Sequence, residues 1–214
     1  TALGEGNAQT GSARYQAHIG ATPVLEGQAQ WTPENWSLAA RAQMDALPQL
    51  TTLVRRIGAN ANVAASGDRV GAFTAHAETP FITLDLSGEL DEEHALVGPA
   101  RFVATTQRGS DIAREAPIEL GAARLEGELR RARGTTAIRA TLDAQEIDAL
   151  GQRVRLTGPV EAALNADRFT LTGDLRAPAG SAPLFAQARL RTTFEFDRRR
   201  GRFNLRQGEL TGDA

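Results

Sequence analysis

The chain has 214 residues and a formal net charge of −2, with arginine and the two acidic residues mixed along its length. This balance excludes the basic stripe that marks a nucleic-acid-binding protein, and the absence of cysteine excludes a disulfide framework and thiolate chemistry. The hydrophobic share is 41% and the aromatic share only 5%. We therefore expect a thin apolar layer of Leu, Val, Ile and Ala without the large aromatic side chains that fill a thick core.

The N-terminal part of the chain predicts paired strands. Residues 14–19 and 24–31 alternate in the manner of strands, with Gly20 and Pro23 between them. The segment from Trp31 to Trp36 allows a helix start capped by Thr32, or a type I turn between two strands that each carry a Trp. Apolar and polar residues continue to alternate after Trp36, so we favour the hairpin.

Residues 45–58 predict a short amphipathic helix inserted into the strand series. Asp45 can serve as its N-cap, and Gly58 is suited to the position after its last turn. Leucine, valine and isoleucine recur at helical spacing and form one stripe over 46–57. Such a stripe must lie on an apolar surface, so the helix is either a plug at the edge of a sheet or a lid over a groove.

The remainder of the chain predicts strands joined by short turns, which are antiparallel neighbours. A loop is expected over 107–117, a register shift near Gly121, and tight connections at residues 91–94, 165–167 and 198–202. The expected strands cover residues 70–77, 82–90, 101–106, 118–130, 136–143, 152–157, 160–166, 168–177, 184–197 and 203–207.

A phrase Leu-x-Gly-x-Leu recurs within these strands. It occurs as Leu86-Ser-Gly88-Glu-Leu90, Leu125-Glu-Gly127-Glu-Leu129 and Leu171-Thr-Gly173-Asp-Leu175, with a variant at residues 156–160 and a truncated copy at residues 210–212. The spacing is about 40 residues, within the range of solenoid and array repeats. Because residue 1 is Thr and the last copy stops in mid-repeat, we expect residues 1–214 to be one segment of a longer repetitive chain.

The candidate catalytic and metal-binding residues favour structural interpretations. The three histidines, His18, His76 and His94, are far apart in sequence, and only His94 has carboxylates beside it. Ser110 lacks the strand–elbow–helix context of a nucleophile. Glu126 and Glu128 share a strand face with arginines, which indicates a solvated face. The sequence predicts no enzyme, metal site or cofactor.

The apolar face of the strands is the feature that needs a function. Two sheets could close over it as a sandwich core. Alternatively, one sheet could curl without closing and leave an apolar trough. Three observations favour the trough: the repeat is open-ended, large aromatics are few, and Ala and Gly punctuate the Leu positions. An exposed apolar surface implies a ligand, a membrane or a partner.

With these repeats, its alternating strands and one amphipathic helix, the sequence resembles the AsmA-like bacterial envelope proteins, the TamB and YdbH group of bridge-like lipid-transfer proteins. The helix at 45–58 favours the YdbH-like branch. The resemblance implies a mainly β fold: an elongated, curled antiparallel sheet, or repeating β-groove. It implies a periplasmic location in a Gram-negative bacterium, an inner-membrane anchor elsewhere in the parent protein, and phospholipid transport between the inner and outer membranes. It carries over no catalytic residue.

On this interpretation, phospholipid acyl chains contact one face of the sheet. The predicted groove residues are Ile82, Leu84, Leu86, Leu90, Leu125, Leu129, Ile138, Leu142, Val154, Leu156, Leu164, Leu171, Leu175, Leu184, Leu190, Phe194 and Phe196. Two other functions remain open. One is an envelope scaffold or assembly factor that binds a polypeptide by strand addition. The other is a closed sandwich, such as an adhesin module, which would expose no apolar face.

Overall fold

The computed structural model consists almost entirely of β-strands, arranged in two compact units, one ending at Ala100 and the other starting at Arg101. It describes residues 2–46, 58–106, 118–132, 134–149, 152–178, 187–197, 199 and 202–213. The prediction of a mainly β, antiparallel fold is confirmed. Within the described ranges, no helix is long and apolar enough to cross a bilayer.

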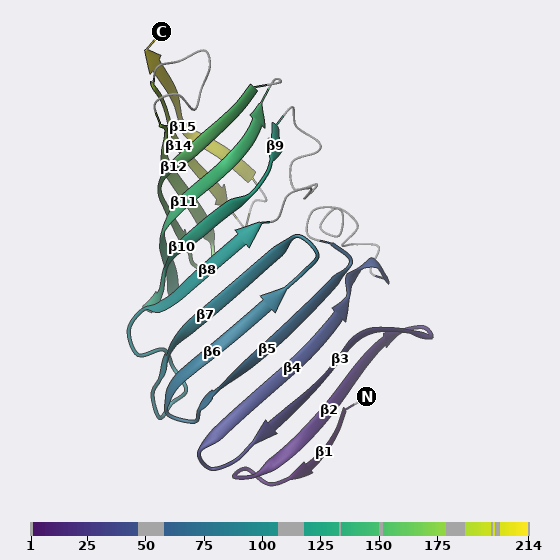
Figure 1. Cartoon of the computed structure of the whole chain (residues 1–214). Helices are drawn as coiled ribbons and strands as arrows, with labels where there is room; N and C mark the ends of the chain where they lie inside the picture. Colours follow the sequence, from purple (N-terminus) through teal and green to yellow (C-terminus); the bar gives the residue numbers. More distant parts are fainter. Residues whose placement is uncertain are drawn as a thin grey trace. The chain divides into compact units, whose positions relative to one another are not determined.

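The first unit is an antiparallel meander in which each strand pairs with the next along the chain (Figure 1). The predicted hairpin is confirmed, because Trp31 and Trp36 are direct cross-strand partners and the Thr32 N–H donates to the Asn35 carbonyl at 2.7 Å. The strands are β1 (Ala2–Gly6), β2 (Gly11–Ile19), β3 (Thr22–Trp31), β4 (Asn35–Gln43), β5 (Asn60–Asp68), β6 (Gly71–Glu78) and β7 (Ile82–Leu90).

The second unit is also antiparallel. Its hydrogen-bonded neighbours follow the order β8-β10-β11-β12-β13-β14-β15, with β9 paired to β11 off this path. The first and last strands of this order are not partners, so the described strands do not close on themselves. The strands are β8 (Ala100–Thr106), β9 (Ile118–Leu120), β10 (Ala123–Ala132), β11 (Thr135–Ala149), β12 (Gln152–Leu164), β13 (Arg168–Ala177), β14 (Gln187–Asp197) and β15 (Arg202–Asp213).

The tight turns share a simple local cause. In the turns that begin at Asn7, Thr32, Thr79, Asp91 and Asn165, the side-chain oxygen of that residue accepts backbone N–H groups two to four residues later. Asn7 Oδ1 accepts from Thr10 at 2.9 Å, Thr79 Oγ1 from Ile82 at 3.0 Å, and Asn165 Oδ1 from Arg168 at 2.8 Å. These bonds satisfy backbone groups that the strand ladder leaves unpaired.

The prediction of a continuous strand over 118–130 is wrong. The chain breaks into β9 and β10 at Gly121 and Ala122, and β11 pairs with both in one continuous register, whereas its pairing with β12 is irregular between Ala144 and Ile147. The cause is the Thr106 hydroxyl, which donates to the Gly121 carbonyl and accepts from the Ala123 N–H, both at 3.0 Å. This side chain replaces a strand partner at the break, so the predicted irregularity at Gly121 lies in the correct place.

The prediction of two strands over 152–157 and 160–166 is also wrong, because β12 runs unbroken from Gln152 to Leu164. Gly158 and Pro159 keep their register with β11, opposite Leu142 and Thr141. The proline φ is compatible with an extended strand, and only its missing N–H matters. Accordingly, the cross-strand partners on the β13 side pass from Thr157 directly to Val160.

The helix predicted over 46–57 lies outside the described residues, apart from its first residue. Asp45, the predicted N-cap, instead occupies the middle of a short 3₁₀ turn, η1 (Met44–Ala46). Its neighbour Met44 is 8% exposed, and the Met44 N–H donates to the Ala59 carbonyl at 2.7 Å. This hydrogen bond therefore links the chain just before residue 47 to the chain just after residue 57, where β4 ends and β5 begins. The predicted loop over 107–117 also lies outside the described residues.

Candidate functional site

The second unit has one face built from large apolar side chains. Cross-strand partners share a face, and one row of partners runs through Leu129, Ile138, Ala162, Leu171, Phe194 and Leu205. A second row includes Leu175 and Leu190. We call this surface the apolar face of the second unit. Its predicted members are Leu125, Leu129, Ile138, Leu142, Val154, Leu156, Leu164, Leu171, Leu175, Leu190, Phe194 and Phe196.

Part of this apolar face is accessible, and part of it is buried. Leu164 is 41% exposed and Phe194 is 36% exposed, whereas inward-facing residues of a closed sandwich core are buried. Each strand of this unit pairs with its sheet neighbours, but the same face is enclosed at Leu175, which is 9% exposed, at Ala140, 8%, and at Ala144, 0%. No large side chain in the described ranges is fully buried. The arrangement is an open sheet whose apolar face is partly buried and partly exposed.

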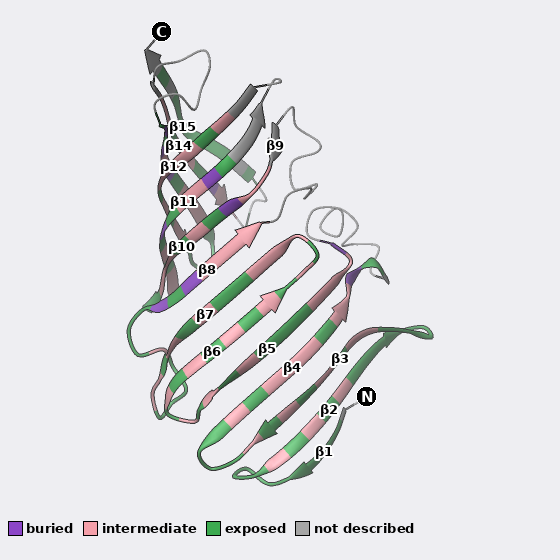
Figure 2. Cartoon of the chain, in the orientation of Figure 1, coloured by how far each residue is buried: buried purple, intermediate pink, exposed green. Residues whose placement is uncertain are grey.

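The first unit has an apolar face of its own. The four predicted residues Ile82, Leu84, Leu86 and Leu90 alternate along β7 and lie together on it. Figure 2 shows the corresponding alternation of half-buried and exposed residues along β6. The predicted residue Leu184 lies outside the described residues. The other large side chains of this face are Tyr15, Leu25, Trp31, Trp36, Leu38, Val63 and Phe73.

The sequence analysis missed the aromatic members of the first unit's face. Trp31 is opposite Gly11, Tyr15 is opposite Gly27, and Phe73 is opposite both Gly67 and Gly88. A Cβ atom built on Gly11 would lie 2.5 Å from the Trp31 ring, and one on Gly88 would lie 2.9 Å from the Phe73 ring. The rings therefore occupy space that the glycines leave free. The expectation of a face without large aromatics is wrong in this unit. A glycine opposite each ring is the sign of this packing, but it can be recognised only when the strand register is known.

The two tryptophans are held at one end of the strands by hydrogen bonds to turn carbonyls. Trp31 Nε1 donates to the Asn7 carbonyl at 2.8 Å, and Trp36 Nε1 donates to the Asp68 carbonyl at 3.1 Å. These bonds satisfy the polar atom of each indole. The ring carbons remain as part of the apolar face.

The opposite face of the second unit carries arginines and carboxylates that form ion pairs with one another. Glu126 and Glu128, the candidate carboxylates, each contact an arginine of their own strand, at 2.9 Å and 3.4 Å respectively. The Arg189 guanidinium donates to Asp174 and lowers the pKa of that carboxyl from 3.8 to about 2, against a smaller opposing effect of desolvation. These contacts make the arginines and carboxylates a solvated ladder across the strands.

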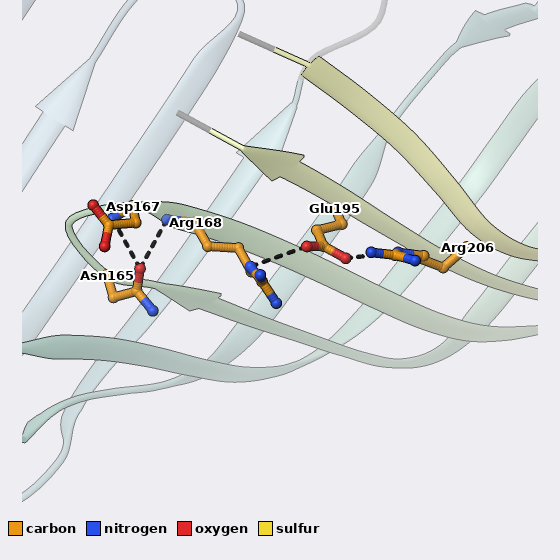
Figure 3. Close-up of polar contacts among 5 residues, drawn as sticks. All are labelled: Asn165, Asp167, Arg168, Glu195 and Arg206. Carbon is orange, nitrogen blue, oxygen red and sulfur yellow. Dashed lines mark hydrogen bonds and ion pairs between the residues drawn. The ribbon is translucent and has the colours of Figure 1, made fainter. Parts of the chain in front are cut away.

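One carboxylate of this charged face is buried. Glu195 is 8% exposed and lies between Arg168, at 2.9 Å, and Arg206, at 2.7 Å (Figure 3). The three residues belong to the neighbouring strands β13, β14 and β15. Arg206 lies at a register irregularity between β14 and β15, which adds a residue to β15. The ion pairs of Glu195 with Arg168 and Arg206 thus link three strands on the charged face, and we assign them a structural role.

His18, His76 and His94 each have a different partner and do not form a common site. The register places Asp85 opposite His76, and the His76 Nδ1 to Asp85 Oδ1 distance is 2.7 Å, a contact that sequence spacing did not indicate. His94 Nδ1 lies 3.2 Å from the Arg69 carbonyl, and His18 pairs with Pro23 near the end of β2. The described residues include no cluster of three or more metal-ligating side chains.

Comparisons with protein-family models, curated proteins and solved structures found no match.

Proposed function

We propose that the apolar faces bind phospholipid acyl chains, and that the chain is a segment of a hydrophobic conduit carrying phospholipids between the inner and outer membranes across the periplasm. In this proposal the sheet curls around the lipid as a groove, and the helix expected over 46–57 covers part of it. The head group stays in water at the rim. The observation that supports the proposal best is the partial exposure of Leu and Phe side chains on the apolar faces of an open sheet.

The energetics suit a conduit. Burying one methylene is worth about 0.8 kcal/mol, so partial burial of an acyl chain against one leucine-lined face yields useful but limited affinity. Leu164 at 41% exposed and Phe194 at 36% exposed retain surface to bury. Weak and nearly uniform binding along the strands lets a lipid move, whereas a deep pocket would hold it in place.

Native mass spectrometry with lipid extraction tests this proposal. Leu171→Asp places a carboxylate on the apolar face of the second unit, and Thr172→Asp places the same carboxylate one residue away on the exposed charged face. We expect phospholipid to co-purify with the wild type and with Thr172→Asp, and to be lost from Leu171→Asp. Folding of each variant is checked by circular dichroism. Lipid retained by a folded Leu171→Asp protein contradicts the proposal, and a bound peptide in place of lipid supports strand addition.

Tryptophan fluorescence locates the lipid on the first unit. The chain has two tryptophans, Trp31 and Trp36, and both lie on that unit's apolar face. Phospholipid brominated on its acyl chains should therefore quench the emission, while the same lipid without bromine should not. Single-tryptophan variants with phenylalanine at the other position assign the quenching to one ring. Equal emission with both lipids would argue against acyl contact in this unit.

A further inference from the structure

The polar face of the first unit, opposite the apolar face, holds an open hollow of about 660 Å³. Its floor is Ala39 and Ala64, which are direct cross-strand partners on β4 and β5. The row continues to Gln28 on one side and His76 on the other, so both alanines lie among the exposed polar residues. The hollow exists because two short side chains interrupt a surface of long ones.

Two arginines border this hollow. Arg14 is the partner of Gln28, and Arg41 lies two residues from Ala39 on β4. Both arginines are exposed, and within the described part of the chain neither forms an ion pair with a carboxylate. The arginines of the second unit's ladder differ, because many of them contact a carboxylate directly. Arg14 and Arg41 thus keep guanidinium groups available to a ligand.

The hollow offers an anion two guanidinium groups and no net positive charge, because Glu26, Asp85 and Glu78 lie on the same face opposite Arg41, His76 and Asn62. Glu26, the direct partner of Arg41, is the carboxylate among the lining residues that the structure describes. His76 Nδ1 is held by Asp85 at 2.7 Å. Strand geometry puts the Cα atoms of Arg14 and Arg41 roughly 12 Å apart, two strands and two residues from each other. Extended arginine side chains can approach one ligand from both sides across that distance.

We propose that this hollow binds a small organic anion, with its carboxylate or phosphate group between Arg14 and Arg41 and its uncharged part on Ala39 and Ala64. A guanidinium fork matches the planar oxygens of either group. The volume is in the range of small-molecule sites. The hollow opens on the face opposite the proposed acyl surface of the same unit, so this site does not depend on lipid binding.

The test uses phenyl phosphate and benzoate as probes and benzyl alcohol as their uncharged counterpart. Titration into ¹⁵N-labelled full chain, followed by two-dimensional NMR, should give saturable shifts centred on Ala39 and Ala64. Arg14→Gln and Arg41→Gln should each weaken binding by roughly tenfold or more, the scale of a charge-assisted hydrogen bond. Arg124→Gln makes the same charge change on the second unit's charged face and should leave the affinity unchanged.

Four results would overturn the proposal. One is the absence of saturable shifts at the hollow with either anion. Another is equal weakening by Arg124→Gln, which would mean general charge attraction. The third is equal affinity for benzyl alcohol. Ala39→Leu guards against a loss of binding that comes from misfolding, because it fills the floor and preserves the charges. The fold is checked by the unchanged spectrum of the other strands, and a folded Ala39→Leu protein that still binds either anion also contradicts the site.

Discussion

The glycine at the centre of Leu-x-Gly-x-Leu gives a sharp test of the packing, because two copies of the motif predict opposite outcomes. A Cβ atom added to Gly127 on β10 would lie 2.1 Å from the Arg139 carbonyl oxygen and 2.6 Å from the Ala140 Cα atom of β11. Both atoms are backbone, so the strands would have to separate. A Cβ atom added to Gly173 on β13 would meet the Thr192 Cγ2 atom at 3.6 Å, which is ordinary contact.

These distances set the expected changes in the free energy of unfolding. Gly127→Ala forces a backbone shift in a tightly packed strand pair, and such overpacking costs about 1–3 kcal/mol. Gly173→Ala needs no shift and reduces the freedom of the unfolded chain, which stabilises by about 0.4–1 kcal/mol. The two variants make the same chemical change at the same position of the repeat. Only the local approach of the neighbouring strand separates them.

Urea unfolding followed by far-ultraviolet circular dichroism measures both variants, because the two tryptophans lie in the first unit and would not report on β10 or β13. We expect a lower midpoint for Gly127→Ala and an equal or higher midpoint for Gly173→Ala, with unchanged slopes. If Gly127→Ala unfolds at the wild-type midpoint, the close approach of β10 and β11 is not what requires the glycine, and the packing argument fails.

Three further predictions concern the charged face and its turns. The pKa of Asp174 is lowered from 3.8 to about 2 in the folded protein, so its contribution to stability is fully present above the unfolded pKa and is lost as the pH falls through about 2. Acid unfolding should show Asp174→Asn less stable than the wild type at pH 7, with a difference that shrinks below about pH 4 and vanishes only below about pH 2. Glu195→Ala, which leaves two arginines without their buried partner, should cost about 1–3 kcal/mol in urea unfolding, and an equally large Glu195→Gln effect would support the ion pairs as the cause, whereas a milder one would indicate side-chain packing. Asn165→Ala removes two side-chain acceptor bonds from its turn and should lower the free energy of unfolding by about 1 kcal/mol, whereas no change would mean that the turn needs only its backbone bond.

Much of the fold could be predicted because strand alternation is a local property. Period-two patterning placed the described candidate residues on the apolar faces before any pairing was known. The pattern carries no information on which residues of different strands become partners. The contacts of Phe73 with Gly88, of His76 with Asp85 and of Arg206 with Glu195 all depend on register, and alternation alone does not give the register.

The prediction of strand boundaries failed in two places, again because contacts between strands decide them. Pro159 reads as a strand break, yet its missing N–H affects pairing on only one side of β12. Gly121 reads as a bulge within one strand, yet the distant Thr106 hydroxyl binds both sides of the gap and divides it into two strands. In each case the deciding interaction comes from another strand, and a single-sequence pattern does not contain it.

The way the sheet is held together determines which substitutions can test lipid binding without destroying the fold. The described strands contact their hydrogen-bonded neighbours within each sheet, and the charged face adds ion pairs between strands. Leu171 is only half-buried, so an aspartate there meets solvent when lipid is absent and costs the fold little. Ala144, at 0% exposed, lies on the same face but is enclosed. Aspartate at Ala144 would bury a charge without a partner and unfold the sheet, so loss of lipid from that variant would carry no information, whereas loss from Leu171→Asp reports on the surface itself.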